Sequence, residues 1–230
     1  MRRGSRMSME ELAPFLFEAA RPRHGEEQEL PTRMQSAGLD SCHLPLDWSR
    51  VFGNGNPVEI EVGFGKGLFL VSSGCARPGT NFFGIEIERK YTLFTATRLA
   101  KRGLRNVKVA ACDARWFLEA HVKAGSVAAV HVYFPDPWWK NRHRKRRLFT
   151  EPFAAQCARV LAGGGHLHLV SDVETYFAET VSMLAQVDVL TPSRPAEVKD
   201  PEHEMDFLTN FERKYRRQGR SIHRGLWRRS

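Results

Sequence analysis

Residues 58 to 62 alternate between apolar and acidic side chains, in the order Val-Glu-Ile-Glu-Val. This period of two predicts a β-strand with one apolar face. A glycine-rich turn and an apolar run from residue 68 follow, which predicts a helix after the strand. The same succession recurs as far as residue 185. Further strands are expected at 81–87, 106–111, 127–134 and 166–170, and further helices at 89–102, 116–122, 150–161 and 173–185.

Strands that alternate with helices at this spacing predict an α/β fold, with a mostly parallel sheet and helices on both of its faces. A chain of 230 residues suits one such domain, which we expect to span residues 46–230. Residues 1–45 are expected to form an N-terminal extension that is partly disordered, because little of that stretch could bury a core.

A carboxylate ends or follows each expected strand. The carboxyl ends of parallel strands meet at one edge of a sheet, where the ligands of such folds bind. The sequence therefore predicts that five acids converge on this edge. They are Glu61, Glu86, Asp113, Asp136 and Asp172.

Gly63, Gly65 and Gly67 form the turn after the first strand. Glycines let the chain turn tightly and let a ligand approach the backbone at the start of the next helix. An acid at the end of the second strand, Glu86, suits the two hydroxyls of an adenosine ribose. The glycine spacing departs from the GxGxxG of dinucleotide folds, and Asp113 could meet an adenine amino group. S-adenosylmethionine is therefore favoured as the ligand, and a nucleotide-dependent oxidoreductase is an alternative.

The stretch from 133 to 148 combines three features. Pro135 and Pro137 hold Asp136 on a stiff loop, because proline fixes φ and cannot donate a ladder hydrogen bond. Trp138 and Trp139 offer flat faces on which a nucleobase could stack. Each feature alone has an ordinary structural explanation, but their combination with the six cations that follow indicates nucleic acid recognition. These cations are Lys140, Arg142, Arg144, Lys145, Arg146 and Arg147.

The net charge of the chain is +9, and the excess is uneven. Eight arginines or lysines lie between residues 212 and 230, against a single acid. This distribution predicts RNA as the partner rather than an anionic membrane, because no basic amphipathic helix has a broad apolar face. The tail cations whose density favours contact with the RNA backbone are Arg213, Lys214, Arg216, Arg217, Arg220 and Arg224.

The four cysteines are widely spaced without a CxxC pair, so they are expected to be reduced thiols. The chain shows neither the apolar run of a signal peptide nor a stretch of about eighteen apolar residues. These features predict a soluble, cytoplasmic protein. No metal site is expected, because His166 and His168 share one side of a strand without a third ligand nearby in the sequence.

Five motifs carry a resemblance to a known family. They are Glu61-Val-Gly-Phe-Gly65, Gly84-Ile-Glu86, Phe134-Pro-Asp-Pro-Trp138 with Lys140 and Arg146-Arg147-Leu148, Ser171-Asp172, and Thr209-Asn-Phe-Glu212. In this order, over about residues 57–227, they resemble the bacterial tRNA (guanine-N7)-methyltransferases. The resemblance implies the class I methyltransferase fold, a Rossmann-like and mostly parallel seven-stranded sheet. It also implies transfer of a methyl group from S-adenosylmethionine to the guanine at position 46, in the variable loop of tRNA, giving 7-methylguanosine.

The resemblance further implies roles for individual residues. Asp136 would be the catalytic residue. The methyl donor would contact Glu61, Gly63, Gly65, Gly67, Glu86, Asp113 and Asp136. The substrate guanosine would contact Lys140, Asp172, Thr209, Asn210, Phe211 and Glu212. Many relatives have His or Pro where Trp139 stands, which leaves the stacking at that position open.

The reaction can also be considered from its chemistry. Guanine N7 carries an in-plane lone pair, so its attack on a sulfonium methyl group requires no general base. Because the product base is cationic, the enzyme chiefly needs alignment and a preorganised negative charge near that cation. An ionised Asp136 could supply this charge, and Asp172 could accept hydrogen bonds from guanine N1–H and N2–H, which adenine cannot match.

Two further readings of function stay open. The sequence Asp136-Pro-Trp138 is similar to a motif of enzymes that methylate exocyclic amines of nucleobases. The second alternative is an RNA-binding protein that has the same fold but no catalytic activity. Against it, a site without activity has no physical need for five desolvated carboxylates. The protein could be a monomer or a homodimer. Two pairs also predict capping boxes at helix starts, Ser171 with Glu174 and Thr209 with Glu212.

Overall fold

The computed structural model describes residues 7–19, 45–138, 147–196 and 207–230. The helices are α1 (Met9–Leu12), α2 (Trp48–Phe52), α3 (Leu68–Ala76), α4 (Arg89–Arg102), α5 (Ala114–His121), α6 (Glu151–Val160), α7 (Glu174–Leu184) and α8 (Asn210–Arg217), with the 3-10 turn η1 (Ala13–Phe15) after α1. The strands are β1 (Leu16–Phe17), β2 (Val58–Val62), β3 (Asn81–Glu86), β4 (Val107–Ala111), β5 (Val127–Tyr133), β6 (Leu161–Ser171), β7 (Leu190–Ser193) and β8 (His223–Arg229).

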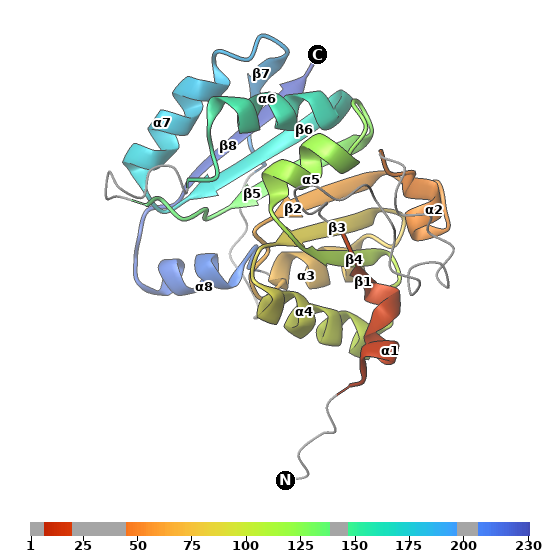
Figure 1. Ribbon diagram of the computed structural model, residues 1–230. Helices are drawn as coiled ribbons and strands as arrows, with labels where there is room; N and C mark the ends of the chain where they lie inside the picture. The colour runs from red at the N-terminus through yellow and green to blue at the C-terminus, as the bar shows by residue number, and fades with distance from the viewer. Residues whose placement is uncertain (1–6, 20–44, 139–146, 197–206) are drawn as a thin grey trace, which may run out of the picture.

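Within the described residues these strands form one sheet of eight, in the order β1-β4-β3-β2-β5-β6-β8-β7 (Figure 1). All neighbours are parallel except that β8 runs antiparallel to β6 and to β7. The predicted fold class is confirmed, but the sheet has one strand more than the seven expected. The additional strand is β1, whose two residues pair with β4. So short an edge strand carries no periodicity that a sequence could show.

Helices cover both faces of the sheet (Figure 1). On one face α5, α6 and α7 pack over a core that includes Phe83, Phe117 and Phe153. On the other, α3, α4 and α8 pack over a core that includes Phe69 and Phe82. Because successive side chains of a strand point to opposite faces, Phe82 and Phe83 of the central strand β3 anchor one core each.

The ends of two elements show where local sequence decides and where it does not. Gly103 ends α4 as predicted, with a φ of +63° that favours glycine. β6, in contrast, begins at Leu161, five residues before the expected start at His166. The glycine run 163–165 does not interrupt it but lies beside a register shift against β5, with Gly164 at a φ of +78°.

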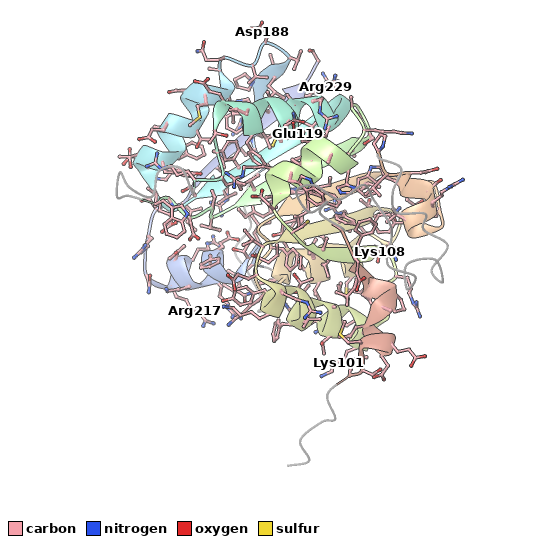
Figure 2. All side chains as sticks on the ribbon, in the orientation of Figure 1. Lys101, Lys108, Glu119, Asp188, Arg217 and Arg229 are labelled. Carbon is pink, nitrogen blue, oxygen red and sulfur yellow. The ribbon has the colours of Figure 1, made fainter. Side chains whose placement is uncertain are left out.

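Part of the predicted N-terminal extension belongs to the folded core. Leu12, Phe15 and Phe17 are buried, and the ring of Phe17 meets that of Phe83 edge to face at 5.5 Å. Lys108, labelled in Figure 2, donates from Nζ to the carbonyl oxygen of Pro14 at 2.8 Å. The expectation that little of this stretch buries a core is therefore wrong for residues 12–17, while residues 1–6 and 20–44 lie outside the described residues.

A chain of hydrogen-bonded polar groups, which begins at the exposed Arg77 and ends at the buried Tyr133, crosses the α3 face of β2 and β5. Glu59 accepts hydrogen bonds from Arg77 Nη1 at 2.6 Å and from His131 Nε2 at 2.9 Å. Burial lowers the pKa of His131, so its ring is neutral. The second ring nitrogen, Nδ1, therefore accepts from the Tyr133 hydroxyl at 2.7 Å. Glu59, His131 and Tyr133 thus each have a hydrogen-bond partner in an otherwise apolar layer.

The Glu59 carboxylate should make stability depend on pH. Burial alone would raise the pKa of Glu59, but the hydrogen bonds from His131 and Arg77 outweigh it and lower that pKa from 4.5 to about 2. The carboxylate therefore stabilises the fold above about pH 4.5, and this contribution is lost as the pH falls towards 2. We expect Glu59→Gln to lower the free energy of unfolding at pH 7 by on the order of 2 kcal/mol.

Urea unfolding of wild type and Glu59→Gln across this pH range tests the expectation. The difference between them should shrink as the pH falls from 4.5 to 2, and a difference that is the same at pH 7 and pH 3 would contradict it. Glu119→Gln, on an exposed part of α5 (Figure 2), is the matched control and should change the free energy of unfolding by less than about 0.5 kcal/mol.

No helix among the described residues is long and apolar enough to span a membrane. Within the same ranges, Cys75, Cys112 and Cys157 are free thiols.

Candidate active site

The glycine turn lies where β2 reaches the carboxyl edge of the sheet. Gly63 N–H donates to the carbonyl oxygen of Ile85 at 2.8 Å, which holds the turn against β3. A Cβ on Gly67 would lie 2.3 Å from Thr95 Cγ2, so this glycine lets α3 start close against α4. Gly65 has a φ of +52°, and apart from Gly65 and its two chain neighbours no atom of the described residues lies within 4 Å of the position that its Cβ would take. The turn is therefore tight on the helix side and open around Gly65, as ligand approach to its backbone requires.

Glu86 closes this turn from the neighbouring strand. Its Oε2 accepts from Gly65 N–H at 2.9 Å, and its Oε1 accepts from Glu88 N–H at 3.0 Å. Each carboxylate oxygen has a second lone pair, so both can still accept a hydrogen bond from a hydroxyl group. The two backbone contacts fix the carboxylate in place for such a ligand.

Glu61 is the least satisfied group at this edge. Its side chain is only 2% exposed, and Oε2 has no hydrogen-bond partner among the described residues. Burial, with a smaller contribution from the charge of Glu86, raises the pKa of Glu61 well above its ordinary value. A buried carboxylate oxygen without a partner is costly, which indicates that a ligand group completes its hydrogen bonding.

Asp113 lies beside this pair, after β4. It begins α5, accepting from Arg115 N–H at 2.8 Å, and also binds the Arg115 guanidinium. The hydrogen bond from the Arg115 side chain chiefly lowers the pKa of Asp113, so the group is ionised. The strand end is held next to Glu86, because Cys112 N–H donates to the Glu86 carbonyl oxygen at 3.0 Å.

Asp136 stands on a strained loop at the end of β5. Phe134 and Trp138, which flank the Pro-Asp-Pro sequence, have φ values of +52° and +42°. Among the described residues they are the non-glycine residues with positive φ, a conformation that costs about 1–3 kcal/mol each and persists only where the surroundings fix it. The Asp136 side chain is exposed, and no described residue hydrogen-bonds its carboxylate. Within the described residues, the loop thus presents the Asp136 carboxylate without a hydrogen-bond partner at the end of β5.

A second cluster lies next to Asp136. Asp172, at the end of β6, pairs with Arg220 Nη1 at 2.9 Å. The Arg220 guanidinium also lies over the ring of Tyr215, 4.8 Å from its centroid. Burial and the charge of Asp172, with a smaller effect of Asp136, raise the pKa of Tyr215. Tyr215 therefore lies near the charges of both Asp172 and Asp136.

Helix α8 carries the last predicted substrate segment. Thr209 accepts from Glu212 N–H at 3.0 Å, as an N-cap should. The other half of the predicted capping box is wrong, because the Glu212 carboxylate binds Leu208 N–H at 2.7 Å and the guanidinium of Arg224 on β8. Glu212 therefore fixes α8 to the sheet.

The side chains beyond that cap extend towards the Asp136 loop and solvent. Phe211 is 47% exposed and its ring stacks on Tyr215 at 6.1 Å, one helical turn later. Asn210 accepts from Arg213 Nη2 at 3.1 Å. The predicted capping box at α7 is also wrong. Ser171 Oγ accepts from Val173 N–H at 3.1 Å, and α7 begins at Glu174 without a side-chain cap.

The predicted RNA-contacting cations of the central basic run and of α8 fall into three groups. Arg213, Lys214, Arg216 and Arg217 lie on α8, and Figure 2 shows Arg217 pointing away from the sheet. Arg147 is turned inward, with a side chain only 12% exposed. The others lie outside the described residues, together with Trp139. They are Lys140, Arg142, Arg144, Lys145 and Arg146.

Sequence reasoning missed the aromatic and arginine partners of the predicted acids. Tyr215 could have been found from its position four residues after Phe211, which places both on one side of a helix. Arg220 and Arg224, expected to contact the RNA backbone, instead pair with Asp172 and Glu212. They gave no local signal of this, because those partners lie 48 and 12 residues away in the sequence.

The remaining features of the surface lie away from this edge. A cavity of about 360 Å³ is lined by residues that include Trp48, Asn56 and Lys123, at the amino end of β2 and so at the opposite edge of the sheet. In the part of the chain that the structure describes, no group of three or more His, Cys, Asp or Glu side chains could hold a metal ion.

Comparison with known proteins identifies the family. A family model described as "Putative methyltransferase" matches residues 55–225. A tRNA (guanine-N(7)-)-methyltransferase of Rhodopirellula baltica is 44% identical over 184 residues, which cover 77% of this chain and 68% of that protein. One of Geobacter metallireducens is 35% identical, over 80% of this chain and 87% of that protein. The chain belongs to the tRNA (guanine-N7)-methyltransferase family.

Solved structures agree with this family at the level of the fold. The aminoglycoside resistance methyltransferase NpmB1 has a TM-score of 0.56 and 19% identity, over 78% of this chain and 90% of that chain. An S-adenosylmethionine-dependent methyltransferase of Aquifex aeolicus has a TM-score of 0.50 and 13% identity, over 77% and 84% of the two chains. The matched region 55–225 contains all five acids at the strand ends.

The unpaired Glu61 should cost stability at neutral pH. Because its folded pKa is raised, the fold is most stable relative to the unfolded chain below the ordinary pKa of about 4.5, and loses stability as the pH rises through the raised value. We expect the free energy of unfolding of Glu61→Gln, relative to that of wild type, to rise by on the order of 1–3 kcal/mol between pH 4 and pH 8. Thermal or urea unfolding at both pH values measures this gain, and any constant effect of the amide cancels in the comparison. A difference independent of pH would contradict the assignment.

Proposed function

We propose that the protein transfers the methyl group of S-adenosylmethionine to N7 of a guanine in tRNA, giving 7-methylguanosine. The observation that carries the proposal is the pair formed by Glu61 and Glu86 around the open glycine turn, within a chain of the tRNA (guanine-N7)-methyltransferase family. The variable-loop guanine at position 46, and action in the cytoplasm, belong to the same proposal.

The residues at the turn suit the methyl donor. The orphaned Oε2 of Glu61 suits the ammonium group of its amino-acid part, and the fixed carboxylate of Glu86 suits the two ribose hydroxyls. Asp113 lies next along the same edge, where an adenine amino group could bind. S-adenosylmethionine, when bound, supplies an electrophilic sulfonium methyl group. NAD is disfavoured by the spacing of the glycines.

The second cluster suits the base. The Phe211 ring is exposed enough to stack on a guanine, an interaction worth about 1–3 kcal/mol. Asp172 can accept from N1–H and N2–H of that base through the lone pairs that Arg220 leaves unused. Lys140, another predicted contact of the guanosine, lies outside the described residues.

Asp136 has the properties of a preorganised charge. Guanine N7 attacks through its own lone pair, so the reaction requires no proton transfer, and positive charge develops on the base. A carboxylate on a stiff loop can oppose that charge without moving, which lowers the barrier more than a mobile group would. Its lack of a described protein partner leaves it available for this role.

The direct test is to incubate the protein with unmodified tRNA and methyl-labelled S-adenosylmethionine and to identify the labelled nucleoside after digestion. We expect 7-methylguanosine from wild type. Label on an exocyclic amine would keep the fold but overturn the base assignment. Binding of donor and tRNA without any label would favour the silent RNA-binding alternative.

Asp136→Asn should reduce kcat on the order of 10²-fold, because it removes the charge and keeps the shape of the side chain. Asp188→Asn is the matched control. It makes the same change in the exposed turn before β7 (Figure 2), at the opposite edge of the sheet, and should leave kcat unchanged. Equal activity of Asp136→Asn and wild type would remove Asp136 from the reaction.

A further inference from the structure

Arg147 lies in the basic motif that predicted RNA contacts, yet its side chain is engaged within the protein. Nε donates to the carbonyl oxygen of Pro137 at 2.8 Å, and Nη1 pairs with Glu179 of α7. The guanidinium lies over the ring of Tyr176, 5.4 Å from its centroid. Its side chain is 12% exposed, whereas Arg217 on α8 is exposed. One guanidinium therefore joins the Asp136 loop to α7 through three kinds of contact.

The loop needs support of this kind. Its first residue is held by the hydrogen bond from Phe134 N–H to the Val170 carbonyl oxygen, 2.7 Å long, and by packing of the Phe134 ring on Tyr215 at 5.5 Å. At its other end Pro137 has no N–H, so its carbonyl oxygen is the backbone group available for a hydrogen bond. Arg147 binds that oxygen, one residue before the positive φ of Trp138. The two contacts hold the two ends of the loop that carries Asp136.

The geometry of these contacts suits arginine and not lysine. A guanidinium is planar and presents donors in fixed directions, so one edge can bind the carbonyl, another the carboxylate, and the face can lie on an aromatic ring. An ammonium group is a compact charge on a flexible stem and cannot make the three contacts at once. A lysine at position 147 would keep the charge, which is all that a phosphate contact needs, but would lose the support of the loop.

We propose that Arg147 is a positioning residue that fixes the Asp136 loop on α7 through Pro137, Glu179 and Tyr176, and that it is not a contact of the RNA backbone. This proposal rests on the proposed methyl transfer for its kinetic consequences only. Its structural part concerns the loop itself and can be measured without turnover.

Kinetics of Arg147→Lys and Glu179→Gln separate the two roles. If Arg147 positions the loop, Arg147→Lys lowers kcat by about 10-fold or more with the KM for tRNA unchanged within about twofold, because small displacements of a reacting group have large effects on rate. Glu179→Gln then lowers kcat in the same direction. If Arg147 instead contacts phosphate, Arg147→Lys is nearly silent, and Glu179→Gln lowers the KM for tRNA because it removes a negative charge beside the cation. That second pattern would overturn the proposal.

Two comparison variants calibrate the result. Arg229→Lys makes the same substitution at an arginine that also donates to a backbone carbonyl, that of Leu161, near the opposite edge of the sheet (Figure 2). It should leave kcat unchanged. Arg217→Ala removes an exposed cation of α8, and should raise the KM for tRNA without lowering kcat.

Hydrogen–deuterium exchange of residues 131–138 provides a readout that does not depend on activity. Arg147→Lys should speed exchange at Phe134, Asp136 and Trp138 several-fold over wild type, while β3 exchanges as before, which shows that the variant is folded. Unchanged exchange in the loop would overturn the proposal. If wild type forms no 7-methylguanosine, the proposed function fails, and the exchange result still decides the role of Arg147.

Discussion

The parallel alignment of β4, β3, β2, β5 and β6 is the constraint on which the rest of this structure depends. Each strand ends at the same edge, and backbone hydrogen bonds continue the alignment beyond the strand ends, from Gly63 to Ile85, from Cys112 to Glu86 and from Phe134 to Val170. The loops that carry the site are therefore registered against one another by the ladder of the sheet. This alignment brings acids far apart in the sequence to one edge without any direct contact among most of them.

The site contains features that lower the stability of the fold, and contacts elsewhere in the fold offset them. One carboxylate oxygen of Glu61, Oε2, is buried without a partner among the described residues, and Phe134 and Trp138 have strained backbones. Such features lower stability and are typical of functional sites. The opposing contribution comes from two aromatic layers and from the satisfied polar chain around Glu59 on the same β2 strand. Glu59 and Glu61 are two residues apart and face the same side, yet their environments shift their pKa values in opposite directions.

Sequence patterns predicted the features that local chemistry decides. The alternation at 58–62 predicted β2, and the glycine after Arg102 predicted the end of α4. Thr209 predicted the start of α8. The placement of acids at strand ends followed from the parallel order alone. What could not be predicted depends on long-range contacts. β8, with the sequence His-Arg-Gly-Leu-Trp-Arg-Arg, has no clear alternation of apolar and polar residues and was not placed, because its identity as a strand comes from pairing with β6 and β7. The inward turn of Arg147 has the same origin, since Glu179 and Tyr176 lie on α7.

A structure of the protein bound to S-adenosylhomocysteine, the demethylated form of the donor, tests the central claim most directly. The account predicts electron density against the open side of the glycine turn, with the ribose hydroxyls on Glu86 and an ammonium group on the Oε2 of Glu61. Density in the cavity beside Trp48 and Lys123 at the opposite edge of the sheet, with that oxygen of Glu61 still unpaired, would contradict it.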